Sequence, residues 1–379
     1  AAEHPDWPAI IFMTTPEPDD PALTLTFRQL FGRVTQAANL FHELSEGEPP
    51  VVAEMLPAMP HAHMALWGGA AAGVAMPLNF LLRPDQLADL MNAAKVTVLV
   101  ALGPNPAVDI WDKVLQIKDK VPSLKAIVQV TGEVAPGLNN VHAFDAAVGA
   151  QPADRLVSGR GFGLDDVAAY FHTGGTTGAP KLAQHRHGNQ VHTAISAAMF
   201  YDAGPEDVIV NGFPLFHVAG AFVYGLSMFA VGAKVVLPTP LGFRDQAYMR
   251  NYWRFVARER VTLLAAVPTI MATLLGTPVG DADISSARLL ATGGSPLPTE
   301  LAAAFEAKFG LPVRNILGMT ECAGVVSIEP VHGPRVPGSA GLRLPFSEVA
   351  AVPLGADGPD LARRCAPGET GVVVLRGPN

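Results

Sequence analysis

Residues 170–181 read Tyr-Phe-His-Thr-Gly-Gly-Thr-Thr-Gly-Ala-Pro-Lys. The apolar run at residues 167–171 is typical of a buried strand, and it stops at a loop with three glycines, three threonines and one lysine. Glycine allows backbone N–H groups to approach an anion closely and permits positive φ. Threonine hydroxyls and a lysine ammonium are further donors to phosphate. The stretch therefore predicts a strand that ends at a polyphosphate-binding loop.

The loop differs from the Walker A sequence G-x-x-x-x-G-K-S/T. Ala179 and Pro180 separate Gly178 from Lys181, and Leu182 follows the lysine. An ordinary P-loop NTPase is therefore disfavoured, and we expect another use of ATP. The alternative is a glycine-rich turn without a ligand, which would leave the hydroxyls and the lysine without a role.

Apolar runs with strand composition alternate with helical segments on both sides of this loop. A capping box at Thr26 and Gln29 predicts one helix start, and Gly310 predicts the end of a helix over residues 299–309. The other expected strands are residues 96–101, 126–130, 208–210, 233–237, 261–267 and 288–291. This alternation predicts an α/β fold with two doubly wound, mostly parallel sheets and flanking helices.

Composition changes near residue 332, where glycine and proline become dense around two short apolar runs, residues 348–352 and 371–375. This pattern predicts a small β-barrel-like subdomain, the start of a β-barrel or a β-layer, and not another βαβ unit. We therefore divide the chain into a first α/β subdomain (residues 1–160), a second with the phosphate loop (161–331) and a β-rich subdomain (332–379).

Composition and charge narrow the function classes. Of the 379 residues, 49% are apolar, which predicts a large buried core, and the net charge of −8 disfavours nucleic acid as a partner. The two cysteines, Cys322 and Cys365, form no disulfide framework, so we expect a cytoplasmic protein.

Two uncharged stretches, residues 62–82 and 211–233, are long enough to span a membrane. Glycine and proline interrupt both, so we expect buried helix–strand units and no integral membrane segment. The sequence leaves open both a weak peripheral contact with a membrane and the formation of a homodimer.

Two further loops follow strand-like runs. Gly318 precedes Thr320 and Glu321, which place a hydroxyl beside a carboxylate, a donor that suits Mg²⁺ next to phosphate oxygens. Gly293 and Gly294 form a turn between a strand and a helix, where open α/β sheets bind ligands. Each loop alone is equally consistent with a surface loop or a structural turn.

A single histidine, His217, lies in the apolar run of residues 214–220. It is either a core histidine or part of a pocket wall for an apolar substrate. His185, His187 and His192 lie close together, but no carboxylate is interleaved, so they do not predict a metal site.

Taken together, these segments resemble the adenylate-forming superfamily of acyl-CoA synthetases, luciferases and peptide-synthetase adenylation domains. The similar segments occur in the family's order and cover nearly the whole chain. They are residues 173–181, 187–189, 214–220, 267–269, 293–297, 318–321, 337–341 and 368–378.

The resemblance implies a nucleotide site with ATP and Mg²⁺. Thr173 and Glu321 would bind the metal, and Thr320 would contact the α-phosphate. The β- and γ-phosphates would lie on the loop of Thr173, Gly174, Gly175, Thr176, Thr177, Gly178 and Lys181. The adenine would be bordered by Gly293, Gly294, Ser295, Leu317, Gly318 and Met319.

It also implies an acyl site and a reaction. The acid would border His217, Val218, Ala219, Gly220 and Val223, and the catalytic residues would be Lys181, His217, Thr320 and Glu321. A carboxylate and ATP would give an acyl-adenylate and pyrophosphate, and a thiol, usually that of coenzyme A, would then take the acyl group.

Three departures from the family pattern stand out. Leu317 replaces a common aromatic residue, so adenine loses a stacking partner, and Gly174 replaces a common serine or threonine. The chain also stops at Asn379, before the family's ribose-binding aspartate, hinge and catalytic lysine. We therefore expect the large N-terminal domain without the small C-terminal domain.

The favoured function is an acyl-CoA synthetase for a fatty or other apolar carboxylic acid. The wall residues expected around it, Val218, Ala219, Phe222 and Val223, include no carboxylate for an amino group. The alternatives are an amino-acid or aryl-acid adenylation domain and a nucleotide- or acyl-binding module without turnover.

Overall fold

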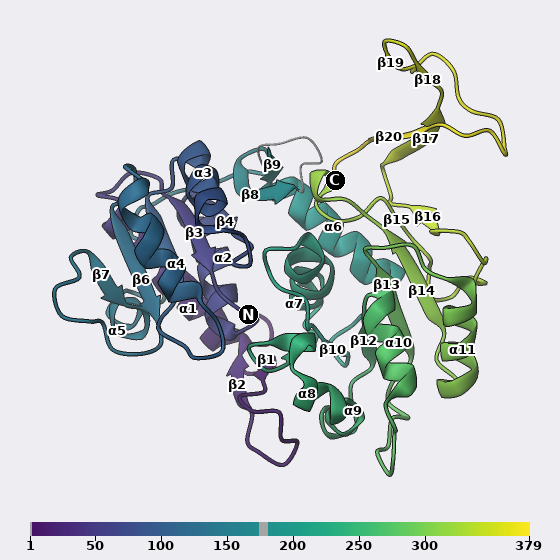
Figure 1. The fold of residues 1–379 in the computed structure, drawn as a ribbon, viewed down its shortest axis with the longest axis horizontal. Helices are drawn as coiled ribbons and strands as arrows, with labels where there is room; N and C mark the ends of the chain where they lie inside the picture. The colour runs from purple at the N-terminus through teal and green to yellow at the C-terminus, as the bar shows by residue number, and fades with distance from the viewer. Residues whose placement is uncertain (1, 174–180) are drawn as a thin grey trace.

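Two mostly parallel sheets, each packed against helices, form most of the computed structural model, which describes residues 2–173 and 181–379 (Figure 1). The predicted phosphate-loop residues between Gly174 and Gly178 lie outside the described residues. The predicted α/β fold with two doubly wound sheets is confirmed.

The first sheet has seven strands in the order β7-β6-β5-β3-β4-β8-β9. All neighbours pair in parallel except β8 and β9, which are antiparallel and flank the predicted phosphate loop. The strands are β3 (Val51–Met55), β4 (Val74–Pro77), β5 (Val98–Leu102), β6 (Ala126–Val130), β7 (Val141–Ala143), β8 (Val167–Thr173) and β9 (Lys181–Arg186).

The second sheet has nine strands in the order β16-β15-β14-β13-β12-β10-β11-β1-β2. Its inner strands are parallel, and β2, β15 and β16 are added antiparallel at the two edges. The strands are β1 (Pro8–Phe12), β2 (Leu23–Thr26), β10 (Val208–Val210), β11 (Lys234–Leu237), β12 (Leu263–Ala265), β13 (Leu289–Gly293), β14 (Val313–Leu317), β15 (Ser327–Ile328) and β16 (Leu342–Arg343).

Helices connect most of the parallel strands, as is usual for crossover connections, whereas a loop joins β6 to β7. The α-helices are α1 (Phe27–Leu44), α2 (Pro60–Ala72), α3 (Pro84–Ala94), α4 (Ile110–Ile117), α5 (Phe144–Gly149), α6 (His187–Phe200), α7 (Ser227–Ala230), α8 (Gln246–Arg250), α9 (Tyr252–Glu259), α10 (Pro268–Gly276) and α11 (Thr299–Phe309). The remaining helices are the π-helix η2 (Ala219–Leu226) and the 3₁₀ helices η1 (Lys118–Lys120), η3 (Gly242–Arg244) and η4 (Thr320–Cys322).

Local sequence signals set several of these boundaries. The Thr26 hydroxyl accepts a hydrogen bond from the Gln29 backbone N–H at 3.2 Å, and the Gln29 side chain accepts one from the Thr26 N–H at 2.8 Å. This is the predicted capping box of α1. Helix α11 ends at Gly310, whose φ of +69° closes the predicted helix.

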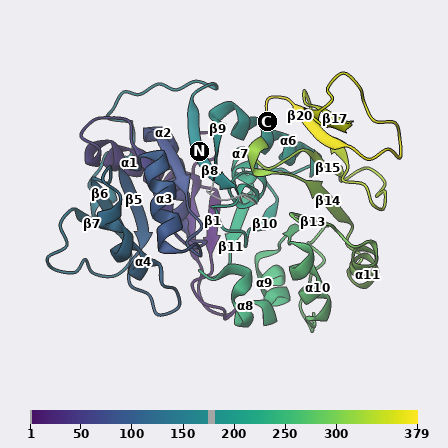
Figure 2. The same ribbon diagram turned by 45° about the horizontal axis from the view of Figure 1, so that its top comes forward.

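Residues 332–379 contain the predicted β-structure, but of the two predicted forms, a barrel and a β-layer, the barrel is wrong. In the part of the chain that the structure describes, these residues form no closed barrel. The strand β17 (Glu348–Val352) pairs with β20 (Val372–Arg376), and β18 (Leu354–Gly355) pairs with β19 (Gly358–Pro359). These two separate strand pairs leave strand edges open. Figure 1 shows both pairs, and Figure 2 shows β17 and β20, projecting from the second sheet.

Strand pairing also departs from the order of the chain. Strands β1 and β2 complete the second sheet, while β8 and β9 belong to the first sheet, and β16 extends the second sheet beyond residue 331. Parallel strands pair through crossovers, so distant segments become neighbours. The division at residues 160 and 331 stays a prediction, but its segments do not correspond to the sheets.

Aromatic packing joins the two sheets. Phe222 of η2 is fully buried and contacts Phe171 of β8 at 5.2 Å and Trp67 of α2 at 6.2 Å between ring centroids. One continuous apolar core includes residues of both sheets. The uncharged stretches that contain α2 and η2 are therefore buried units, as predicted. Among the described helices, none has the length and apolar character needed to cross a membrane.

His63 of α2 lies inside this shared core. Its side chain is 1% exposed and packs edge-on against Phe229 of α7 at 5.3 Å. Neither ring nitrogen has a hydrogen-bond partner among the described residues. Burial lowers the pKa of His63 from 6.5 to about 3, because the charged ring would lose its hydration.

Acid should therefore destabilise the fold through His63. The unfolded chain binds a proton on this ring near pH 6.5, whereas the folded chain stays neutral until about pH 3. The contribution of the neutral His63 ring to the free energy of unfolding is therefore complete above the unfolded pKa. It is lost as the pH falls toward the folded pKa, at up to about 1.4 kcal/mol per pH unit. We expect His63→Phe to show a shallower fall in the free energy of unfolding between about pH 6 and pH 4 in urea titrations.

The exposed His332 provides the matched control, because its ring pairs with Asp202 on the surface. His332→Phe should keep the steep slope of the parent chain. If the free energy of unfolding falls with pH at the same slope in the parent chain and in His63→Phe, the acid sensitivity does not come from His63.

Candidate functional site

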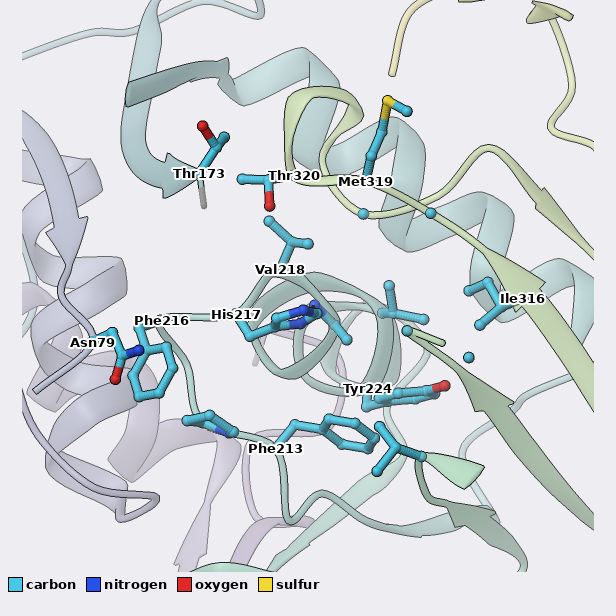
Figure 3. Close-up of a pocket in the computed structure, with 18 of the residues that line it drawn as sticks. Asn79, Thr173, Phe213, Phe216, His217, Val218, Tyr224, Ile316, Met319 and Thr320 are labelled. Carbon is cyan, nitrogen blue, oxygen red and sulfur yellow. Dashed lines mark hydrogen bonds between the residues drawn. The ribbon is translucent and has the colours of Figure 1, made fainter. Parts of the chain in front are cut away.

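A cavity of about 520 Å³ lies where the carboxyl ends of strands from both sheets converge (Figure 3). Strands β4, β8, β12, β13 and β14 all end at or next to residues that line it. Open α/β sheets bind ligands at such ends because the loops between strands and helices meet there. This main cavity is lined by Asn79, Leu81, Thr173, Phe213, Pro214, Phe216, His217, Val218, Ala219, Val223, Tyr224, Arg244, Val267, Gly293, Gly294, Ile316, Gly318, Met319, Thr320, Glu321 and Gly324.

Two threonines mark one end of the main cavity. Thr173 ends β8 and Thr320 begins η4, and these two elements are in contact. Figure 3 shows their hydroxyl-bearing side chains next to each other above Val218. The arrangement places two donors beside the predicted phosphate loop.

His185 of β9 fixes the position of Thr320. Its Nε2 donates a hydrogen bond to the Thr320 carbonyl at 2.6 Å, and its ring packs against both Phe171 and Phe222. The side chain is 1% exposed, and burial lowers the pKa of His185 although the Thr320 carbonyl and Glu321 oppose that shift. A buried neutral ring thus ties the strand after the phosphate loop to the Gly318–Glu321 segment.

Glu321 is the one carboxylate among the described residues that line the main cavity. Its side chain makes no hydrogen bond or ion pair with the described residues. No group of three His, Cys, Asp or Glu residues elsewhere in residues 2–173 and 181–379 could hold a metal ion. Among the described residues at this end, the Glu321 carboxylate and the hydroxyls of Thr173 and Thr320 are oxygen donors that a hard cation could use.

His217 lines the main cavity in a defined tautomer. Its Nδ1 accepts a hydrogen bond from the Ala219 N–H at 3.2 Å, so the neutral ring carries its proton on Nε2. Partial desolvation by the cavity wall lowers the pKa of His217, which favours the neutral ring. His217 therefore offers a hydrogen-bond donor to the cavity it lines. Because the residue is exposed, it is part of the pocket wall and not the core histidine of the alternative prediction.

A second histidine is held in the same way behind the cavity wall. His172 Nε2 accepts a hydrogen bond from the Asn79 N–H at 3.1 Å. Burial, and secondarily the nearby His217, lower the pKa of His172. The bond connects β8, just before the phosphate loop, to the loop that brings Asn79 to the cavity.

Glycine is required on steric grounds at one predicted position. A Cβ on Gly318 would overlap the backbone oxygen of Gly324. The close approach folds residues 318–324 back on themselves, and it directs Thr320 and Glu321 to the cavity. The glycine thus has a structural role whether or not it also borders a nucleotide.

The structure brings most of the predicted site residues to the main cavity. Those that line it are Thr173, His217, Val218, Ala219, Val223, Gly293, Gly294, Gly318, Met319, Thr320 and Glu321. Those described but not lining it are Lys181, Gly220, Ser295 and Leu317. Their functional roles stay predictions.

Two predicted wall residues have other environments. Phe222 is buried in the core between the sheets and does not line the cavity. A Cβ on Gly220 would lie 2.6 Å from the Pro214 carbonyl oxygen, so backbone packing of η2 occupies this position. The π-helix rotates these residues away from the cavity, and the apolar sequence gave no sign of that helix type.

Sequence reasoning missed several cavity residues. Asn79 and Leu81 come from the first sheet, and their place just after β4 was the available signal, since ligands bind beyond strand ends. Arg244 comes from η3, and nothing in the local sequence distinguishes it from a surface arginine.

The fold and this cavity agree with comparisons to known proteins. The family model described as AMP-binding enzyme matches residues 1–379. The chain belongs to the AMP-binding enzyme family, which confirms the resemblance to adenylate-forming enzymes.

Two relatives and one solved structure illustrate this membership. Marinolic acid–CoA ligase of a Pseudoalteromonas species is 31% identical over 98% of this chain and 57% of its own length. Sulfoacetate–CoA ligase of Cupriavidus necator is 31% identical over 100% of this chain and 68% of its own length. The crystal structure of the anthranilate CoA ligase AuaEII with anthranoyl-AMP shares the fold, with a TM-score of 0.85, 22% identity and coverage of 99% of this chain and 67% of that one. This chain thus spans little more than half of the length of the marinolic acid–CoA ligase.

Loss of the His185 hydrogen bond should loosen the cavity. His185→Leu leaves the Thr320 carbonyl without its partner, and we expect the free energy of unfolding to fall by about 1–3 kcal/mol. AMP binding, measured by titration calorimetry, should weaken as well because Thr320 lines the cavity. Urea titrations of His185→Leu and the surface variant His332→Leu provide the comparison, and equal losses in both would contradict the role of His185.

Proposed function

We propose that the protein containing this chain is an acid–thiol ligase. A carboxylate oxygen of the acid attacks the α-phosphorus of ATP, and pyrophosphate leaves. The sulfur of coenzyme A then attacks the acyl carbon, and AMP leaves. The observation that carries the proposal is the convergence of Thr173, Thr320 and Glu321 with His217 on one cavity in a member of the AMP-binding family.

The lining of the main cavity fits ATP and Mg²⁺. The hydroxyls of Thr173 and Thr320 are donors for phosphate oxygens, and the Glu321 carboxylate has no competing partner among the described residues. Mg²⁺ keeps few protein ligands and takes further oxygens from phosphate and water. When bound, it would supply positive charge to the phosphates. Glu321 and Thr173 would hold it, and Thr320 would hydrogen-bond the α-phosphate as negative charge develops there.

The acyl part of the cavity supports an acid with an apolar body. Phe213, Phe216, Val218, Val223 and Tyr224 form the wall beside His217. The neutral His217 can donate from Nε2 to the carboxylate without adding a charge. A fatty or other apolar acid would bury its chain against this wall and present the carboxylate to the threonine end. We also propose a cytoplasmic location, which the unpaired Cys322 and Cys365 support.

Acid-dependent exchange of pyrophosphate into ATP tests this function directly. The complete protein is assayed with octanoate, benzoate, leucine and a no-acid control. Exchange with octanoate or benzoate, followed by formation of the CoA thioester, is the expected result. Exchange with leucine alone would favour amino-acid activation. Tight ATP binding without exchange on any acid would favour a binding module without turnover.

Removal of the Glu321 charge should impair use of ATP with Mg²⁺. For Glu321→Gln we expect kcat/KM for ATP to fall by on the order of 10²-fold or more, because the amide binds the cation far more weakly. Glu300→Gln, which changes an exposed carboxylate in the first turn of α11, is the matched control and should retain activity. Unchanged kinetics in Glu321→Gln would remove this residue from the site.

A further inference from the structure

A second hollow, here called the side cavity, adjoins the main cavity. It is lined by residues of η3, α8 and α10, among them Phe243, Gln246, Met249 and Ile270. Arg244 lines both cavities. Phe213 of the main cavity also packs edge-on against Phe243 of the side cavity, with ring centroids 6.0 Å apart. Arg244 therefore borders both spaces.

Two arginines make the side cavity positively charged. Arg244 and Arg250 line it, and no Asp or Glu among the described residues does so. Neither guanidinium forms an ion pair or a side-chain hydrogen bond with the described residues. The nearby Arg254, in contrast, pairs with Asp19 at 3.1 Å. The side cavity is thus lined by two exposed arginines that pair with no carboxylate of the described residues.

The carboxylate next to Arg244 in the sequence is occupied elsewhere. Asp245 accepts hydrogen bonds from the Thr239 hydroxyl at 2.7 Å, the Ala247 N–H at 2.9 Å and the Tyr248 N–H at 3.1 Å. These bonds cap the N-terminus of α8. Asp245 therefore caps α8 and forms no ion pair with Arg244, so the Arg244 guanidinium can bind a ligand.

The two ends of the main cavity differ in polarity. Figure 3 places Thr173 and Thr320 at one end and Phe213 with Tyr224 at the opposite end, with His217 between them. An acid whose carboxylate reaches the threonine end would direct its other end past His217 and Phe213. Arg244 lines the main cavity together with Phe213, and the residue before it, Phe243, packs on Phe213.

We infer that the side cavity binds a second anionic group of the acid substrate, such as a carboxylate or sulfonate, through Arg244 and Arg250. The inference rests on the proposed ligase function and narrows its substrate class to acids with an apolar middle and an anionic far end. A guanidinium pairs with such groups through two parallel charge-assisted hydrogen bonds. A simple alkyl chain would instead place methyl groups beside two unpaired cations.

Acyl-sulfamoyl adenosines, which mimic the acyl-adenylate, test this inference by titration calorimetry on the complete protein. Adipoyl and suberoyl analogues, which end in a free carboxylate, are compared with the hexanoyl and octanoyl analogues of equal chain length. We expect at least one of the carboxylate-ended analogues to bind about 10-fold or more tightly than its alkyl match. Arg244→Gln and Arg250→Gln should each reduce that ratio, and Arg244→Lys should retain part of it.

The ratio of the affinities for the carboxylate-ended and the alkyl analogue is measured within each variant. A general loss of folding therefore affects both affinities alike. Arg254→Gln changes an exposed arginine outside both cavities and should keep the ratio of the parent protein. Equal affinity for both analogue classes in the parent protein would overturn the inference and leave the ligase function intact. Binding of inorganic phosphate without a preference for carboxylate-ended analogues would also overturn it. Failure of every analogue to bind would contradict the proposed function itself.

Discussion

The burial of Phe222 between Phe171 and Trp67 is the contact on which the rest of the structure depends. It joins helices and strands of two separate sheets into one apolar core. This shared core holds the two sheets together, so that the carboxyl ends of their strands face one common cavity. The site is therefore a consequence of apolar burial, which supplies most of the stabilising free energy of folding.

Neutral histidines connect this core to the cavity. His185 donates to the Thr320 carbonyl, while His172 and His217 accept backbone N–H groups. Desolvation lowers the pKa of each ring, so each acts as a fixed hydrogen-bonding group and not as a charge. Fixed dipoles of this kind need no reorganisation when a ligand binds, which suits a site that handles a charged phosphate.

Charge in the site is placed at its two ends and excluded from its middle. Glu321 lies beside the threonines, Arg244 lies at the junction with the side cavity, and apolar residues line the wall between them. The geometry thus suits an elongated molecule with polar groups at both ends.

The sequence by itself determined the α/β class, the capping box of α1, the end of α11 and the loops that carry Thr173, Gly293 and Thr320. These features depend on local periodicity, glycine conformation and short motifs. Only the tertiary structure decided that β1 and β2 complete the second sheet, that η2 turns Phe222 into the core, and that the predicted barrel does not close. It also decided that His185 holds Thr320 and that Arg244 faces two cavities. Such contacts join residues far apart in the chain, and their free energy depends on burial and packing that no local pattern encodes.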